Sequence, residues 1–280
     1  IQQCFLTTIS ASTMNTAQNH NSTHNHAKAS RPSMQVEIWS DVMCPFCYIG
    51  KRRFEEALRH FPHAEQIAVT WKSFQLDPTI PISTSIADST SNTAQNLGTY
   101  AEYLAHRKGM SISHVRQMFA NVAAMGAEAG VTLNFDTAII ANSFPAHRLL
   151  HLAHADGRQN TLKEVLLKAH FTDGADIGNL NTLISLGESI GLNTNDIQTM
   201  FAGKDYEEDV QNDIHEAQHL GIQGVPFFVF NRRYAVSGAQ SSQVFAEVLQ
   251  QLFDEWSQEE AAQHLQITDG EVCTPDGICA

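Results

Sequence analysis

Cysteine is scarce in this chain and confined to its two ends. The 280 residues include five cysteines, at positions 4, 44, 47, 273 and 279, and the long stretch between Cys47 and Cys273 has none. This distribution excludes a disulfide scaffold, in which cysteines are spread densely along a short chain. Any cysteine chemistry must therefore depend on two close pairs, Cys44 with Cys47 and Cys273 with Cys279.

The chain also has little positive charge and no long apolar run. It carries 17 Lys and Arg against 30 Asp and Glu, a formal net charge of −13. This balance argues against a nucleic-acid partner, because such proteins usually present a basic surface. No apolar run approaches the roughly 20 residues of a membrane span, so we expect no membrane insertion. The hydrophobic content of 42% is ordinary for a soluble globular protein.

Residues 1–33 lack both a secretory signal and enough apolar side chains for a core. Their Gln, Asn, Ser, Thr and His content predicts a disordered segment, in which Cys4 has no role and the histidines are a polar tail rather than metal ligands. Met14 and Met34 are both candidates for the native start. Because no basic, apolar leader is recognisable, we expect a cytoplasmic protein. In that reducing compartment a cysteine pair is more often catalytic or metal-binding than structural.

Strand-like and helix-like patterns alternate at both ends of the remaining chain. The first part reads strand, helix, strand, a βαβ unit with a right-handed crossover. The last part reads as a hairpin followed by an amphipathic helix, whereas everything from 97 to 220, including TAIIANSFPAHRLLHLAHADG, is helical in character. We expect strands at 35–39, 67–71, 227–230 and 234–236, and helices at 44–61 and 241–256. The strands form one sheet only if the helical block is an insertion.

Cys44 falls where the first strand passes into a helix. A thiolate there faces unpaired backbone N–H groups and the positive end of the helix dipole, so we expect the pKa of Cys44 to lie well below the free-thiol value of about 8.5. Pro45 suits the first helical position. Cys47, one turn later, is close enough to attack a mixed disulfide at Cys44. The spacing therefore predicts an exposed nucleophile with a resolving thiol, as thiol–disulfide exchange requires.

A zinc site is the competing interpretation of the pair. Structural zinc needs four ligands, and Cys273 and Cys279 make a poor second half because they lie five residues apart on a polar tail. Three histidines could supply imidazoles, but their helical spacing suits packing or surface positions better. These are His147, His151 and His154. We therefore expect no metal.

A second signal is Gly224-Val225-Pro226-Phe227, just before a predicted strand. Proline cannot donate to a strand ladder and is best placed at the first residue of a strand. X–Pro bonds are also the only peptide bonds that adopt cis at modest cost. The signal is weak alone, but it is considerably stronger together with a C-x-x-C motif at the front of the fold.

At this point the sequence resembles the DsbA-like thioredoxin-fold oxidoreductases, and more narrowly their FrnE-like branch. The resemblance rests on SDVMCPFCYIGKRRFEEAL, NSFPAHRLLHLA, TDGADIGN and EAQHLGIQGVPFFVFNRRYAVSGAQ, and it covers roughly residues 35–256. It implies an α/β architecture, a thioredoxin fold (βαβ … ββα) interrupted by an all-helical insertion domain. The expected units are a disordered segment at 1–33, a thioredoxin-like domain at 34–96 and 221–256, a helical insertion at 97–220, and a flexible tail at 257–280.

The resemblance also implies roles for the residues around the pair. Cys44 would be the nucleophile and Cys47 the resolving thiol. Pro226 would be a cis-proline whose loop faces the pair, with Val225 offering backbone groups to an extended substrate. Pro45 and Phe46 would complete the substrate-binding surface. Because this dipeptide lacks the imidazole of strongly oxidising relatives, we expect a weaker oxidant.

Further candidates lie outside these motifs. By analogy with the family, four residues of NSFPAHRLLHLA could line a cleft near Cys44, whereas packing and a structural ion pair are the alternative; they are Asn142, Phe144, His147 and Arg148. Glu37 and Asp41 could assist proton transfer for Cys47, although Asp41 is more simply a helix cap.

The leading hypothesis is a thiol–disulfide oxidoreductase or isomerase acting on protein thiols or disulfides. It would use no bound cofactor, with glutathione or a thioredoxin-type protein as a candidate reductant, and act as a monomer or homodimer. One alternative is a glutathione-dependent isomerase or kappa-class glutathione transferase, although these usually have serine at the nucleophile position. Another is a redox-sensing holdase. Cys273 and Cys279 are either incidental tail thiols or an auxiliary redox pair that exchanges with Cys44–Cys47.

Overall fold

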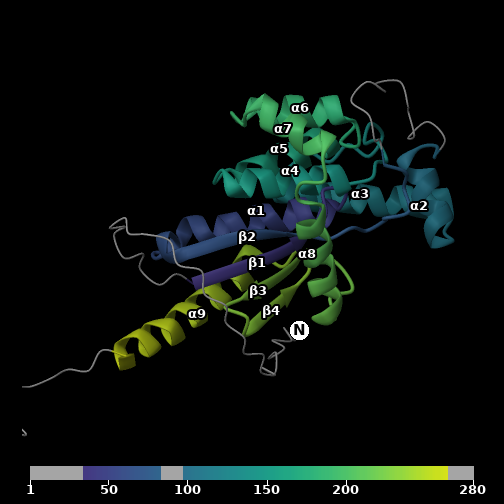
Figure 1. Cartoon of the computed structure of the whole chain (residues 1–280). Helices are drawn as coiled ribbons and strands as arrows, with labels where there is room; N and C mark the ends of the chain where they lie inside the picture. The colour runs from purple at the N-terminus through teal and green to yellow at the C-terminus, as the bar shows by residue number, and fades with distance from the viewer. Residues whose placement is uncertain (1–33, 83–96, 264–280) are drawn as a thin grey trace, which may run out of the picture.

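One sheet of four strands lies at the centre of the part of the chain that the structure describes, residues 34–82 and 97–263 of a computed structural model. The strand order is β2-β1-β3-β4 (Figure 1). The strands are β1 (Met34–Ser40), β2 (Ile67–Ser73), β3 (Phe227–Phe230) and β4 (Tyr234–Ser237). The expectations for residues 1–33, for Cys4 and for the pair Cys273 and Cys279 fall outside the described residues.

The pairing of the strands confirms the thioredoxin fold. Ile38 of β1 is in register with Trp71 of the parallel strand β2 and with Phe228 of the antiparallel strand β3. β3 and β4 form an antiparallel hairpin. A βαβ unit and a ββα unit thus share one sheet, and the chain between them is helical, as the sequence predicts.

The helices are longer than the strands. They are α1 (Pro45–His60), α2 (Tyr100–Lys108), α3 (Ile112–Glu128), α4 (Phe144–Ala155), α5 (Gln159–Phe171), α6 (Leu180–Ser189), α7 (Thr194–Ala202), α8 (Glu207–His219) and α9 (Ser242–Gln263), with a 3₁₀ turn at Ala64–Gln66. No helix among the described residues is both long enough and apolar enough to span a bilayer.

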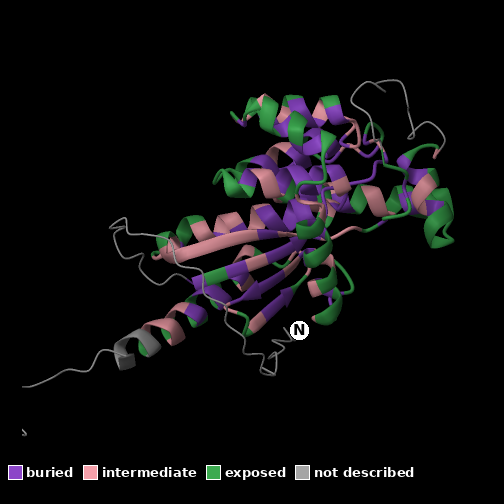
Figure 2. Cartoon of the chain, viewed as in Figure 1, coloured by how far each residue is buried: buried purple, intermediate pink, exposed green. Residues whose placement is uncertain are grey.

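Helices cover both faces of the sheet. Successive side chains of a strand point to opposite faces, so each face presents apolar side chains for helices to bury. Val36 and Ile38 of β1 and Phe228 of β3 point into a core that α1 and α9 close with Phe54 and Phe245. Trp39 and Val229 point to the other face, where Ala217 of α8 packs. The Trp39 indole N–H also donates to the carbonyl of Asp213 in α8 at 2.9 Å. Figure 2 shows the buried residues concentrated along these contacts.

A second core fills the helical domain, which we define as α2–α7. It is built from buried leucines of α4, α5 and α6, such as Leu149, Leu166 and Leu183. The same core includes Met43 and Ile49, which flank the cysteine pair. The helical domain therefore packs directly against the segment that positions Cys44, rather than standing apart from the sheet.

The side chain of Gln159 joins the helical domain to the free edge of β2. Its amide accepts the Trp71 backbone N–H and donates to the Trp71 carbonyl, both at 2.9 Å. Asn160 accepts the Trp71 indole N–H at 2.9 Å. A sheet edge leaves such backbone groups unpaired unless something covers them. α5 thus protects β2 and is itself held in one place.

Two boundaries differ from the sequence predictions. Residues 137–143 are not helical, and α4 begins only at Phe144, because Pro145 fits a first turn and the Asn142 side chain accepts the Phe144 N–H at 2.8 Å. The last helix does not end near Trp256 but continues to Gln263. No proline or glycine between Trp256 and Gln263 stops it.

Candidate active site

Cys44 and Cys47 meet at the start of α1. Cys44 occupies the N-cap position with extended backbone, Pro45 lies in the first turn, and the Cys47 N–H donates to the Cys44 carbonyl at 3.0 Å. Both thiols are free. Cys44 retains 4% of its surface and Cys47 none, while Phe46 between them is 39% exposed. A large reagent can therefore reach the pair only at Cys44.

The loop before β3 faces the first cysteine. The Val225–Pro226 bond is cis, as the family resemblance implies. The Cys44 Sγ lies 3.4 Å from the Val225 carbonyl oxygen and can donate its proton there. The Gly238 N–H donates to the Pro226 carbonyl at 2.8 Å, which ties the loop to the end of β4. Residues far apart in sequence thus form one small surface around Cys44.

The pKa values of the two thiols shift in opposite directions. Burial raises the pKa of Cys44 well above its usual value, and its interaction with Cys47 raises it further. Burial also opposes ionisation of Cys47, but the hydrogen bond from Cys44 and the positive charge of Lys163 lower the pKa of Cys47 below its usual value. The prediction of a low pKa at Cys44 is wrong for this geometry. Burial and the interaction between the two thiols outweigh the helix terminus at Cys44, and the pKa shifts favour a negative charge on Cys47 over one on Cys44.

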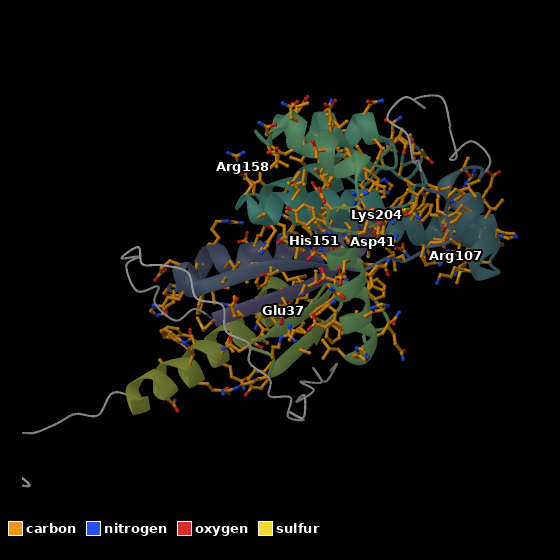
Figure 3. The ribbon with its side chains drawn as sticks, in the orientation of Figure 1. Glu37, Asp41, Arg107, His151, Arg158 and Lys204 are labelled. Atoms are coloured by element: carbon orange, nitrogen blue, oxygen red, sulfur yellow. The ribbon has the colours of Figure 1, made fainter. Side chains whose placement is uncertain are left out.

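Asp41 anchors the turn that leads into Cys44. Its carboxylate accepts the Leu76 N–H at 2.7 Å and the Met43 N–H at 3.3 Å, and His147 Nε2 lies 3.5 Å away. Burial raises the pKa of Asp41, but His147 and the Leu76 N–H lower it more, so the net shift is downward. The carboxylate stays ionised and supports the loop; it does not cap α1, because Cys44 is the N-cap residue and Asp41 binds the N–H groups of Met43 and Leu76 instead. Figure 3 shows Asp41 and His151 where the sheet meets the helices.

Comparison with known proteins agrees with this geometry. The model of the DSBA-like thioredoxin domain family matches residues 35–250. The chain belongs to this family. A crystal structure of a probable DsbA oxidoreductase from Streptomyces coelicolor is 35% identical, with a TM-score of 0.70 over 88% of this chain and 98% of that one.

Two more distant proteins are similar to this chain, one in sequence and one in structure. The uncharacterized protein YwbO of Bacillus subtilis (strain 168) is 23% identical over 78% of this chain and 96% of its own length. The cytosolic disulfide reductase DsbM from Pseudomonas aeruginosa has 14% identity and a TM-score of 0.50, over 81% of this chain and 99% of that one. At these identities the likeness to DsbM concerns the fold alone.

In this DsbA-like chain, two of the residues expected to line a cleft, Asn142 and Arg148, make hydrogen bonds within the helical domain and the loops beside it. Asn142 is 3% exposed, and its side chain is saturated by Gln75, the Phe144 N–H and the Ile80 carbonyl. Arg148 donates to the carbonyls of Met200, Gly203 and Asp205 and so caps the end of α7. These side chains hold the helical domain together rather than meet a substrate.

Phe144 and His147 also lie away from the expected surface. Phe144 and Arg148 line a hollow of about 380 Å³ whose other walls include Phe201 and Lys204, and this lining contains none of the cysteines or the Val225–Pro226 loop. His147 is 1% exposed and lies behind the pair, beside Asp41. Glu37 forms an ion pair with Arg232 at 2.6 Å, far along β1 from the cysteine end.

Lys163 of α5 is a further residue of the site, outside the motifs that the sequence singles out. This lysine is fully buried, and its charge acts on Cys47. A signal was available, because Lys163 shares a helix face with Leu166, Leu167 and His170, all of which are buried. A cation within an apolar stripe deserves a functional explanation. Within residues 34–82 and 97–263, no group of three or more His, Cys, Asp or Glu is placed to hold a metal ion.

Proposed function

We propose that this protein is a thiol–disulfide oxidoreductase that exchanges electrons between Cys44–Cys47 and protein thiols or disulfides. One observation carries the proposal. A C-x-x-C pair lies at the start of α1, and only its first cysteine, whose sulfur lies 3.4 Å from the Val225 carbonyl oxygen, retains any exposed surface. This arrangement exposes one attacking sulfur and keeps its partner in reserve.

The reductive half-reaction follows from this arrangement. In the proposed half-reaction the reduced pair starts with one proton and one negative charge; the directions of the pKa shifts favour the proton on Cys44 and the charge on Cys47. As the Cys44 sulfur attacks a substrate disulfide, its proton passes to Cys47 and the first substrate sulfur leaves as a thiolate. That thiolate takes up the proton from Cys47, and the Cys47 sulfur then attacks Cys44. The second substrate sulfur leaves, two electrons have moved to the substrate, and the pair is a disulfide. Oxidation of a dithiol is the reverse.

The surface around Cys44 suits an extended polypeptide. Val225 offers its backbone beside Cys44, and the exposed Phe46 ring and Pro45 provide apolar contact. Glutathione or a thioredoxin-type protein is the class of thiol that would return the pair to its reduced form. We propose a cytoplasmic location, in agreement with the description of DsbM as a cytosolic disulfide reductase.

Insulin reduction and the refolding of scrambled ribonuclease test this function. With glutathione as the reductant, we expect the wild-type protein to accelerate both at least about tenfold over glutathione alone. Failure in both assays, with Cys44 and Cys47 shown by mass spectrometry to be reduced at the start, would contradict the proposal. Turnover of a small-molecule glutathione conjugate in the same preparation would instead support a transferase or isomerase.

Gly50 tests whether the cis-proline loop matters to this activity. A Cβ built at Gly50 of α1 meets the Pro226 Cγ at 2.8 Å, which is closer than real atoms approach. Gly50→Ala must therefore push the loop away from Cys44, and we expect kcat/KM for insulin reduction to fall about tenfold, since small misplacements at a reacting centre are costly. Gly224→Ala is the matched control, because a Cβ there meets nothing within 4 Å. Equal activity of the two variants would show that the loop position is unimportant.

A further inference from the structure

Lys163 is a buried amine without a hydrogen-bond partner. It is 0% exposed, and its Nζ contacts no acceptor among the described residues. The Nζ lies over the Trp71 ring, 5.5 Å from its centroid. Burying an ammonium group in this way is expensive, because ordinary salt bridges and water are both lost. Such a group calls for an explanation beyond packing.

The residues on either side of Lys163 determine where it points. Toward the start of α5, Gln159 and Asn160 bind Trp71 of β2. Immediately after it, Glu164 accepts hydrogen bonds from Tyr48 at 2.8 Å and from Lys51 at 2.9 Å. Tyr48 directly follows Cys47 in α1, and Lys51 lies one turn later. Lys163 is therefore held between the β2 edge and the turn of α1 that carries Cys47.

The charges that face Lys163 come from several elements. Cys47 and Cys44 of α1 and Asp41 of the preceding turn favour its protonated form, whereas Lys51 of α1 opposes it. His147 of α4 is also within the range of its charge. Burial is the largest influence and lowers the pKa of Lys163 to about 8. The amine thus remains mostly protonated near pH 7, next to two sulfurs and one carboxylate.

We propose that Lys163 is a positioning residue that supplies the counter-charge of the reduced Cys44–Cys47 pair, so that the helical domain sets the reduction potential of the thioredoxin unit. This inference rests on the proposed function. A protonated amine stabilises a thiolate, which only the reduced pair can form because the disulfide carries no charge, and it therefore favours the reduced state. Loss of the amine must then favour the disulfide and make the potential more negative.

The test compares Lys163→Met with Lys168→Met. Methionine has a similar length and no charge, and Lys168 lies in the same helix but is exposed and pairs with Asp173. The full-length proteins are equilibrated in glutathione buffers at pH 7, and the disulfide fraction is counted by alkylation and mass spectrometry. For Lys163→Met we expect a shift of at least about tenfold toward the disulfide, which is about 30 mV more negative. The thiolate absorbance of the reduced pair should also titrate at higher pH. Lys168→Met should match the wild type.

A measurement on the wild-type protein keeps the proposal testable if Lys163→Met does not fold. The Lys163 side chain is followed by NMR in ¹³C-lysine-labelled protein, in the reduced and in the disulfide state. We expect its titration midpoint to fall when the thiolate is lost. An identical midpoint in both states, or an unchanged glutathione equilibrium in a folded Lys163→Met protein, overturns the inference. If the wild-type protein forms no Cys44–Cys47 disulfide in glutathione buffer, the proposed function itself fails.

Discussion

Replacing Cys44 with serine should lower the rate of insulin reduction to less than about one-hundredth of the wild-type rate. Cys44 is the only residue of the pair with any exposed surface, 4%, and Cys47 is wholly buried. A serine hydroxyl is a far weaker nucleophile toward sulfur than a thiol. Because Cys47 is buried, it cannot replace Cys44 in the attack on a substrate disulfide. The rate is measured by insulin turbidity with glutathione as the reductant.

The matched variant Cys47→Ser should fail in a different way. Cys44 can still attack, but no resolving thiol follows, so a mixed disulfide between Cys44 and the substrate should accumulate and be visible on a non-reducing gel. Cys44→Ser should show no such adduct. If Cys44→Ser kept its activity, or if the adduct formed through Cys47, the assignment of nucleophile and resolving thiol would be reversed.

Replacing Phe54 with alanine should cost about 3–5 kcal/mol of unfolding free energy. Phe54 is 1% exposed and lies in the middle of the sheet core, with its ring centroid 5.5 Å from those of Phe228 and Phe245. It therefore connects α1, β3 and α9. Truncation leaves a cavity that the surrounding rings cannot fill without moving the sheet. Urea unfolding followed by fluorescence measures the change.

Phe46→Ala is the control for this prediction. Phe46 belongs to the same helix but is 39% exposed, so its truncation should change the unfolding free energy by less than about 1 kcal/mol. A cost below about 1 kcal/mol for Phe54→Ala would mean that the core between α1 and α9 can close around the gap. That outcome would contradict the close packing seen among the rings.

Much of the fold could be predicted because its signals are local. The alternation in QVEIW, the helical spacing of Ile49 and Phe54, and the proline before β3 each depend on neighbouring residues. The motif C-P-F-C indicated the position of the reactive pair for the same reason. The end of α9 lies beyond the predicted one because the change to polar residues after Trp256 suggests a tail, whereas no proline or glycine stops the helix before Gln263.

The surroundings of the pair could not be predicted, because they depend on contacts between distant segments. Lys163 reaches Cys47 only because Gln159 and Glu164 attach α5 to β2 and α1. The pKa of Cys44 was misjudged for a related reason. The helix terminus is visible in the sequence, whereas the burial of both sulfurs and the charge from α5 arise from tertiary packing. Likewise, no local sequence pattern predicts that Arg148 donates hydrogen bonds to carbonyl groups in and just beyond α7.

The insertion of the helical domain between β2 and β3 has a consequence for how the chain is made. The hydrogen bond from the Gln35 N–H to the Asn231 side chain, which closes the sheet beside β1, joins residues 196 positions apart. At roughly 5–20 residues per second, a ribosome needs on the order of 10–40 s to add that length. β1 can pair with β2 early, but its other edge must wait for β3. Open edges of this kind recruit other chains. The insertion that places Lys163 near the cysteines thus also leaves one edge of β1 without its strand partner until β3 emerges.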